Sequence, residues 1–416
     1  MTGAMYAAIA GLRTHMQNLN VIGNNVANVN TYSYKSGRAI FKTSLYTTLS
    51  GGSNGTTVSG GKNPSQIGYG STVGSVDIDM STGNYGVTGK PTDLMLDGDG
   101  FFLLGDKSQT LNFDGEDPNE LKSLTLTRLG NFEFKADGYL TNEAGMVVYG
   151  FACIGTYKEG DVIPDGKKIG DPIFSDQLVP IRYPRVYSDK DGGLHIGYPK
   201  PGGGTNTDDR LNDAAAGGGQ QPGDPAAATN KHLYDYGTTL KDNGETVEST
   251  YEVAKFTNIS FSETTGLITG TSEATGEVVT IGCVAVGMVT NPNGVTQVGS
   301  TNYKAGEGAG DLSVAILGGG AQSMGITQVN KSLIPADGNA GGNAGGDPDA
   351  ADATIVDGLR IRTSGTLMRS AGLEMSKTDL AQEIANMIVT QRGYQANTRI
   401  ITVTDSMLEE LVNMKR

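Results

Sequence analysis

The side chains that most often do chemistry are few in this sequence and lie far apart. The histidines, His15, His195 and His232, have no cysteine and no nucleophile motif beside them. The cysteines, Cys153 and Cys283, form no CxxC pair, so the sequence indicates neither a zinc site nor a disulfide framework. We expect two small buried thiols and, at position 15, a histidine at a surface or an interface.

Two glycine-containing motifs resemble ligand-binding loops without completing them. The run DGDG at residues 97–100 starts like a calcium loop, but it lacks the full aspartate spacing and the glutamate that closes such a loop. The Gly-Lys pairs at 61–62 and 89–90 are followed by Asn and Pro, so neither forms a phosphate-binding loop. Hydrolase and zinc-protease motifs are absent from the sequence. We therefore predict no cofactor, no metal site and no enzymatic activity.

Charge and hydropathy exclude two classes of partner. The formal net charge is -14, and no block of Lys and Arg interrupts the sequence, so a nucleic acid is not expected to bind. No apolar run approaches the roughly 18 residues that span a bilayer. The opening AMYAAIAGL lacks a preceding basic residue and a cleavage site, so we expect it to be retained. If the protein leaves the cell, we expect a route other than a cleaved signal peptide.

A first amphipathic helix is predicted from the N-terminus to about Val29. Four asparagines close it, and asparagine favours helix ends because its side chain bonds the local backbone. We assign the helix end and the turn that follows to Asn24, Asn25, Asn28 and Asn30. The apolar seam of this helix, with spacings of three and four, is Met5, Ile9, Leu12, Met16, Leu19 and Val26.

A second, longer helix is predicted at the other end of the chain, with a start near Ser376 and Asp379 that resembles a capping box. Lys415 and Arg416 would place positive charge at its C-terminal end. Two apolar stripes make a face broad enough for more than one neighbouring helix. The first contains Leu380, Ile384, Met387, Tyr394, Ile401, Leu408 and Val412, and the second contains Ile400, Met407, Leu411 and Met414.

Neither predicted helix is expected to be stable on its own. A helix from residue 377 to the end would be about 60 Å long, longer than a small domain is wide. Gly393 and the β-branched run TRIITVT lower its intrinsic helicity, and asparagines do the same for the first helix. We expect both ends to fluctuate in the monomer and to fold when they pack with copies from other chains.

The sequence between the helices alternates apolar and polar residues and carries turn signals, which predicts β structure. Residues 200–229 and 336–353 are low-complexity loops with too little apolar content for a core. The predicted fold class is mixed α and mainly β. The N- and C-terminal helices pair as a coiled-coil-like inner domain, and β-rich outer domains are inserted between them.

Several separated motifs resemble one protein family in the right order. AGLRTHMQNLNVIGNNVANVNTYSYK is similar to the N-terminal signature of the bacterial flagellar axial proteins of rod and hook, and residues 373–416 are similar to the C-terminal helix of the hook proteins. The resemblance also covers residues 32–151 and about 278–310, which include stretches similar to the first β domain of that family. The resemblance departs at "SYK", where the family usually has a Gly-Phe pair before the lysine.

The resemblance implies a structural subunit that polymerises into a short, curved, hollow tube, the hook, which acts as a universal joint and transmits motor torque from rod to filament. It implies a homopolymer on the extracellular flagellum, exported without a cleaved signal peptide. The other implied partners are the distal rod protein, the hook cap, the first hook-filament junction protein, the hook-length control protein and the flagellar type III export apparatus. A distal rod protein and a secreted β-rich adhesin are the alternatives.

The resemblance also implies a division of the chain. Residues 1–31 and 372–416 would form the helical inner-tube domain, and 32–72 a connecting segment that we expect to set bending stiffness. Residues 73–151 and 286–371 would form the first β domain, with a Gly-rich insertion at about 311–358, and 152–285 the second, outer one. Self-assembly through the inner helices is assigned to Leu12, Met16, Leu19, Val26, Leu380, Ile384, Met387, Tyr394, Ile401, Leu408 and Leu411.

Overall fold

The structure is a computed structural model, and it places the chain in two compact units. Unit 1 contains Met1–Gly83 and Met375–Arg416, and unit 2 contains Asn84–Glu374. The described residues are 2–55, 57, 60–107, 119–156, 169–174, 178–188, 194–197, 200–201, 234–235, 240–242, 245–247, 252–253, 255–273, 275–299, 301–317, 354–356, 359–364 and 366–414.

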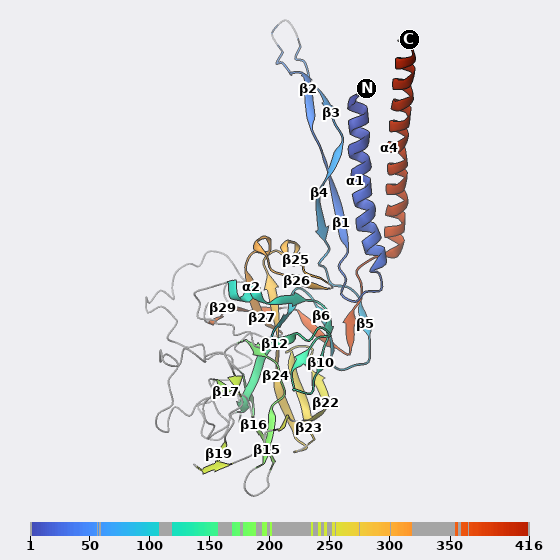
Figure 1. Cartoon of the computed structure of the whole chain (residues 1–416). Helices are drawn as coiled ribbons and strands as arrows, with labels where there is room; N and C mark the ends of the chain where they lie inside the picture. The colour runs from blue at the N-terminus through green and yellow to red at the C-terminus, as the bar shows by residue number, and fades with distance from the viewer. Residues whose placement is uncertain are drawn as a thin grey trace. The chain divides into compact units, whose positions relative to one another are not determined.

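Part of what the sequence predicted lies outside these residues. That part comprises nearly all of the loop at 200–229, the loop at 336–353, most of the insertion at 311–358, and the basic end at Lys415 and Arg416. Elsewhere the predicted fold class is confirmed, because a helix stands at each end and the chain between them is mostly β (Figure 1). None of the described helices is long and apolar enough to cross a membrane.

Unit 1 consists of two long helices and a two-stranded ribbon. Helix α1 (Thr2–Ala27) and helix α4 (Leu380–Met414) lie side by side, with the ribbon next to α1 (Figure 1). Asp379 is the N-cap of α4, because its Oδ1 accepts hydrogen bonds from the backbone N–H of Ala381 (3.0 Å) and Gln382 (3.2 Å). The Ser376 hydroxyl instead accepts from the N–H of Thr378, so the predicted cap at Ser376 is wrong.

The ribbon is built from two antiparallel pairs in succession. Strand β1 (Gly37–Thr43) pairs with β4 (Ser71–Ile78), and β2 (Tyr46–Ser50) pairs with β3 (Ser65–Gly68). A bulge opposite Ile40 and Phe41 leaves Gly74 as the extra residue, which bends and twists a ribbon locally. An isolated two-stranded ribbon is marginally stable in water, so this one depends on its contact with α1.

Two contacts at the start of β4 help to hold the ribbon on α1. The Thr14 hydroxyl lies 2.9 Å from the backbone oxygen of Ser71 and 2.8 Å from that of Ala10, and its single proton is shared between these two acceptors. Gly70 has a φ of +101°, and a Cβ at that position would lie 2.8 Å from the Cβ of Ala10. Only glycine combines that backbone conformation with so close an approach to a helix.

Unit 2 is mainly β. Its elements up to residue 201 are β5 (Tyr85–Val87), β6 (Asp93–Asp97), β7 (Phe101–Gly105), α2 (Asn119–Ser123), β8 (Thr125–Thr127), β9 (Gly130–Asn131), β10 (Glu133–Phe134), β11 (Leu140–Thr141), β12 (Val147–Thr156), β13 (Pro172–Phe174), β14 (Val179–Pro180), β15 (Arg185–Ser188), β16 (Leu194–Gly197) and β17 (Lys200–Pro201). Its later elements are β18 (Tyr234–Asp235), β19 (Leu240–Asp242), β20 (Glu245–Val247), β21 (Glu252–Val253), β22 (Phe256–Phe261), β23 (Leu267–Ser272), β24 (Val278–Val289), β25 (Thr296–Gln297), β26 (Asn302–Lys304), β27 (Leu312–Leu317), β28 (Thr354–Val356), β29 (Leu359–Ser364), β30 (Leu367–Ser370) and β31 (Gly372–Glu374).

Two long strands organise the largest sheet of unit 2. Strand β12 pairs with β7 and β24, and β24 pairs in turn with β7, β23 and β27. The predicted boundary between two β domains, at residues 151–152, falls within β12, and the division into domains stays a prediction. The sheet buries the main apolar cluster, which includes Leu96, Phe102, Leu104, Phe132, Val148, Ile281, Val284, Val286 and Met368.

Both cysteines lie inside this unit, as the sequence predicted. Cys153 is 1% exposed and Cys283 is fully buried, and neither forms a disulfide. Burial raises the pKa of the Cys283 thiol to about 12. A thiol in that environment is a small apolar side chain rather than a nucleophile.

A buried ion pair explains the DGDG run at residues 97–100. The Arg128 guanidinium is 2% exposed and donates from Nη1 to the backbone oxygens of Gly98 (2.7 Å) and Gly100 (2.9 Å). Its Nε lies 3.6 Å from Oε2 of Glu374, which is 1% exposed. The loop carbonyls therefore bind an internal arginine, and the pair joins this loop to β31.

We predict that Arg128→Met destabilises unit 2 by about 3–5 kcal/mol, because it leaves the Glu374 carboxylate buried without its cation. Urea unfolding followed by tyrosine fluorescence measures the loss. Adding Glu374→Gln to the variant should recover part of it. Arg369→Met is the control, because its pair with Asp97 (2.8 Å) is half-exposed and should contribute less than about 1 kcal/mol. Equal losses for Arg128→Met and Arg369→Met would contradict the assignment.

Candidate self-assembly interface

Helices α1 and α4 run antiparallel, and four contacts share one register. Gly11 faces Asn397, and His15 faces Gly393. Further along, Asn18 Nδ2 donates to Thr390 Oγ1 at 2.9 Å, and Asn25 Nδ2 donates to Glu383 Oε1 at 3.0 Å. Each step forward along α1 is matched by the same step backward along α4, so the pairing is uniform from end to end.

Small residues let the two helices approach closely. A Cβ added at Gly393 would lie 2.6 Å from Cε1 of His15, and one added at Gly11 would lie 2.9 Å from Nδ2 of Asn397. The His15 ring also packs edge-on against Phe41 of the ribbon, with centroids 6.0 Å apart. His15 is therefore an interface residue, one of the two places that the sequence predicted for it.

The faces in contact combine small and polar residues with a few apolar side chains. On α4, Thr390 is 4% and Thr404 is 8% exposed, and both lie on the side that meets α1. On α1 the contact face contains Ala8, Gly11, His15, Asn18, Ile22 and Asn25. This face is displaced by one residue, or about 100° around the helix axis, from the apolar seam predicted from the sequence.

The residues predicted to mediate self-assembly therefore occupy two kinds of position. Partly buried in the chain are Leu12, Leu19, Val26, Met387, Tyr394 and Ile401. Exposed between 38% and 47% are Met16, Leu380, Ile384, Leu408 and Leu411. Their role in self-assembly stays a prediction.

Sequence reasoning missed the contact face because glycine, histidine and asparagine count against a helix seam. The signal that could have found it is the spacing of these residues. Gly11, His15, Asn18 and Asn25 fall on one side of a helix at steps of four, three and seven. A polar residue at a helix contact fixes register at some cost in stability, as in coiled coils.

Asn25 joins three chain segments where α1 ends. Its side chain is buried, at 1% exposed, and all its hydrogen-bonding capacity is used. The side-chain amide of Asn25 bonds both backbone groups of Gly37, donating to O at 2.8 Å and accepting from N at 2.9 Å. It thus pairs with the first residue of β1 in the way that the backbone of a neighbouring strand would. Its remaining bonds go to Glu383 on α4 and to the Tyr34 hydroxyl (3.0 Å).

The other asparagines have different positions. Asn28 is half-buried and its side chain folds back onto Asn24, donating to the backbone oxygen at 2.9 Å and to Oδ1 at 3.1 Å. Asn24 Nδ2 donates to the Tyr34 hydroxyl at 3.0 Å. Asn30 is exposed. The helix ends at Ala27, two residues before the predicted end, and turn bonds to Asn28 and Thr31 lead the chain to Tyr34.

Residues Ser33, Tyr34 and Lys35 (SYK) connect the turn to the ribbon. Ser33 is fully buried with a φ of +57°, a left-handed conformation that favours glycine. This conformation is the physical reason why glycine suits the position. Tyr34 is 8% exposed, and its pKa is raised, first by burial and then by the charge of Glu383. Compared with phenylalanine, its hydroxyl adds the bonds to Asn24 and Asn25.

Basic residues close the junction between the start of α4 and the ends of the ribbon. The backbone N–H of Lys377 donates to the backbone oxygen of Tyr34 at 3.2 Å. The side-chain Nζ of the buried Lys35 donates to the backbone oxygen of Ser81 at 2.7 Å. The pKa of Asp79 is lowered, mainly by the hydrogen bond from the Ser81 hydroxyl and also by the charges of Lys377 and Lys35. The junction thus ties together the base of both helices and both strand ends.

Large apolar side chains remain uncovered on both helices. Their number is unusual for a surface in water, and such surfaces mark protein-protein interfaces. They are Met5, Tyr6 and Met16 on α1, and Leu380, Ile384, Ile388, Val389, Ile400, Val403, Met407, Leu408, Leu411, Val412 and Met414 on α4. Exposed apolar side chains on a paired set of terminal helices are typical of the structural subunits that assemble through such helices.

Comparison with known proteins agrees with this class. Residues 5–35 match the family described as flagella basal body rod protein, and residues 369–414 match the family described as flagellar basal body rod FlgEFG protein C-terminal. The first match covers α1 and the asparagine junction as far as Lys35. The second covers β31 and α4.

Similar full-length proteins carry flagellar names. The chain is 29% identical to the flagellar hook protein FlgE of Borreliella burgdorferi and 26% identical to the flagellar basal-body rod protein FlgG of Bacillus subtilis, over 100% of both chains in each case. It is 26% identical to FlgE of Salmonella typhimurium, over 98% of this chain and 99% of that one. The two ends of the chain are therefore domains of the flagellar rod and hook protein family, and the full-length relatives are named as structural proteins of the flagellum.

We predict that Asn25→Ala destabilises the helix pair by at least about 2 kcal/mol, because it leaves buried polar groups of Gly37, Tyr34 and Glu383 without their partner. Urea unfolding followed by far-UV circular dichroism measures this. Asn30→Ala is the matched control, because Asn30 is exposed, and it should change stability by less than about 0.5 kcal/mol. Similar losses for both variants would show that Asn25 does not join the segments.

We also predict a loss of helix stability at alkaline pH that depends on Tyr34. Its folded-state pKa lies above the ordinary value of 10.0, so the folded chain is stabilised relative to the unfolded chain below that pH and loses stability as the pH rises toward the raised pKa. Tyr34→Phe should weaken this dependence in thermal melts recorded between about pH 8 and 11. Tyr32→Phe, which removes the hydroxyl of a residue that is 44% exposed, should leave this pH dependence unchanged. A wild-type pH dependence in Tyr34→Phe would contradict the prediction.

Proposed function

We propose that this chain is the subunit of a flagellar hook. The observation that carries the proposal is the uncovered apolar surface of α1 and α4, which their polar contact leaves for other copies. In this proposal the terminal helices of many subunits pack into an inner tube, and the β-rich part of each subunit forms the outer layers. The polymer is a curved, flexible tube that transmits motor torque from rod to filament.

The hook is favoured over the rod by two features. The hook-like end of α4 and the length of the chain both fit a hook subunit better than a distal rod subunit. The full-length similarity to a rod protein keeps the distal rod as the second candidate. A rod subunit would polymerise into a stiff, straight tube. The shape of the polymer therefore separates the two functions.

The proposal includes a setting and a set of partners. The subunit would act on the outside of the cell, after export through the flagellar type III apparatus without a cleaved signal peptide. Its neighbours would be further copies of itself, the distal rod protein, the hook cap, the first hook-filament junction protein and the hook-length control protein. These follow from the family resemblance.

The test is electron microscopy of the purified full-length chain under polymerising conditions, together with circular dichroism. We expect curved tubes and a rise in helicity on assembly. The variant Ile388→Ser with Val403→Ser removes two side chains that are 53% and 51% exposed, each worth roughly 1.5–3 kcal/mol when buried. The concentration needed for assembly should rise at least about tenfold.

The control is Gln391→Ser with Gln395→Ser, which changes exposed polar residues of the same helix and should assemble like the wild type. Straight tubes would support the rod instead. A wild-type chain that stays monomeric and fully helical would refute assembly through the helices.

A further inference from the structure

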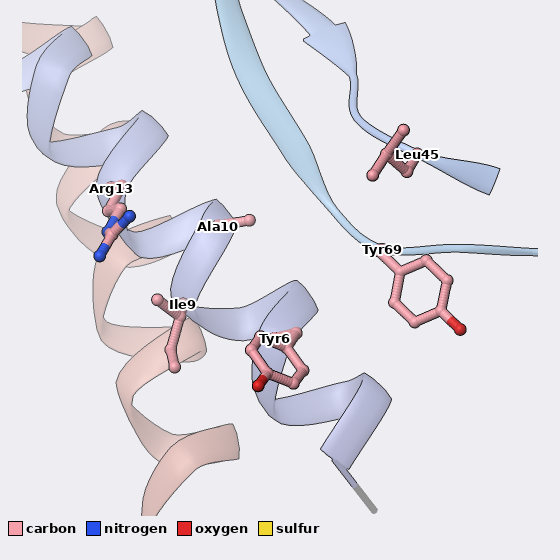
Figure 2. A pocket seen from close by; sticks show the side chains of 6 residues that line it. All are labelled: Tyr6, Ile9, Ala10, Arg13, Leu45 and Tyr69. Carbon is pink, nitrogen blue, oxygen red and sulfur yellow. The ribbon is translucent and has the colours of Figure 1, made fainter.

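A shallow groove lies between α1 and the ribbon. Tyr6, Ile9, Ala10 and Arg13 line it from successive turns of α1, and Leu45 and Tyr69 line it from the ribbon (Figure 2). Its volume is about 340 Å³. Tyr6 is 66% and Leu45 is 73% exposed, so the lining is apolar and open to solvent.

The groove has a single positive charge at its edge. Arg13 is the one residue of α1 with a formal charge, and it is exposed. Among the described residues it has no hydrogen bond and no ion pair, whereas Arg38, Arg128 and Arg369 each face a carboxylate. The groove therefore offers an apolar lining and an unpaired cation to an apolar and acidic partner.

The end of α4 has the complementary properties. The side of α4 that meets α1 follows Glu383, Met387, Thr390, Tyr394, Asn397, Ile401 and Thr404, at steps of three and four. The next positions on that side are Leu408 and Leu411, and in the register of the pair they lie past Thr2, where α1 begins. They are 38% and 42% exposed, and Glu409 and Glu410 lie between them.

The end of α4 cannot reach the groove of its own chain while the register holds. The pairing holds Asn397 against Gly11 and Gly393 against His15, which are on another side of α1 from Tyr6, Ile9 and Arg13. The occupant that the charges and apolar residues favour is therefore the same segment of another copy.

We propose that residues 407–414 of one copy lie in the groove of a neighbouring copy. Leu408 and Leu411 pack on Tyr6, Ile9, Leu45 and Tyr69, and a carboxylate of Glu409 or Glu410 pairs with Arg13. This inference rests on the proposed function, since it names one surface of the polymer, and its test separates the two.

The first test is charge reversal in the full-length chain, with the concentration needed for assembly as the readout. Arg13→Glu alone, and Glu409→Arg with Glu410→Arg, should each raise that concentration at least about tenfold, because both place like charges together. The triple variant should return to within about threefold of the wild type. Lys304→Glu, an exposed charge reversal in unit 2, should assemble like the wild type.

The second test is a crosslink between copies. Leu45→Cys with Leu411→Cys should give disulfide-linked ladders when the assembled polymer is oxidised, and no ladder in the dilute monomer. The native thiols Cys153 and Cys283 are buried, so they do not compete. Circular dichroism of each variant checks that the helices are retained.

The outcomes separate the two proposals. If the wild-type chain forms tubes but Arg13→Glu assembles as readily and the cysteine pair gives no ladder, the docking of α4 in this groove is wrong and the hook proposal stands. If the triple variant assembles no better than Arg13→Glu, the pairing of Arg13 with Glu409 or Glu410 is wrong. If the wild-type chain forms no tubes, the proposed function itself fails.

Discussion

The rest of unit 1 depends on the polar contact between α1 and α4. Small residues at Gly11 and Gly393 allow a close approach, and hydrogen bonds from Asn18 and Asn25 fix the register. An apolar contact would tolerate sliding by a turn, because one aliphatic side chain replaces another, whereas a displaced asparagine leaves a buried polar group unsatisfied. The register is therefore specified, and exposed apolar side chains such as Ile388 and Val403 remain outside the contact.

The same contact continues into the ribbon through a few side chains. Asn25 bonds α4, Tyr34 and the first residue of β1 at once, and Lys377 bonds Tyr34 from the segment that precedes α4. The ends of both helices and both strands of the ribbon are thus held at one point. In the proposed polymer a load on the helices would pass through this junction, so buried and fully paired hydrogen bonds fit that place better than mobile surface contacts.

The sequence predicts both helices, the β-rich middle and the buried cysteines, because periodicity and composition carry that information. The contact face of α1 could not be read in the same way. Met5, Leu12 and Met16 form the visible seam, while the residues that meet α4 include His15, Asn18 and Asn25, whose value depends on partners hundreds of residues away. Asparagine was expected to end the helix, and Asn28 does contribute to the turn, but Asn25 acts as a link between segments. The buried pair of Arg128 and Glu374 has no sequence signal because it is made by tertiary folding.

The central claim is that each subunit keeps its own α1–α4 register and uses the outer faces of the helices for its neighbours. A cryo-electron microscopy map of the assembled polymer, at a resolution that shows side chains, tests this most directly. The account predicts Gly11 against Asn397 and Asn25 against Glu383 within one chain, with Ile388, Val403 and Leu411 in contact with other chains. A map in which α1 and α4 of one chain are separated, or slide by a turn to pair through Leu12 and Leu19, would contradict it.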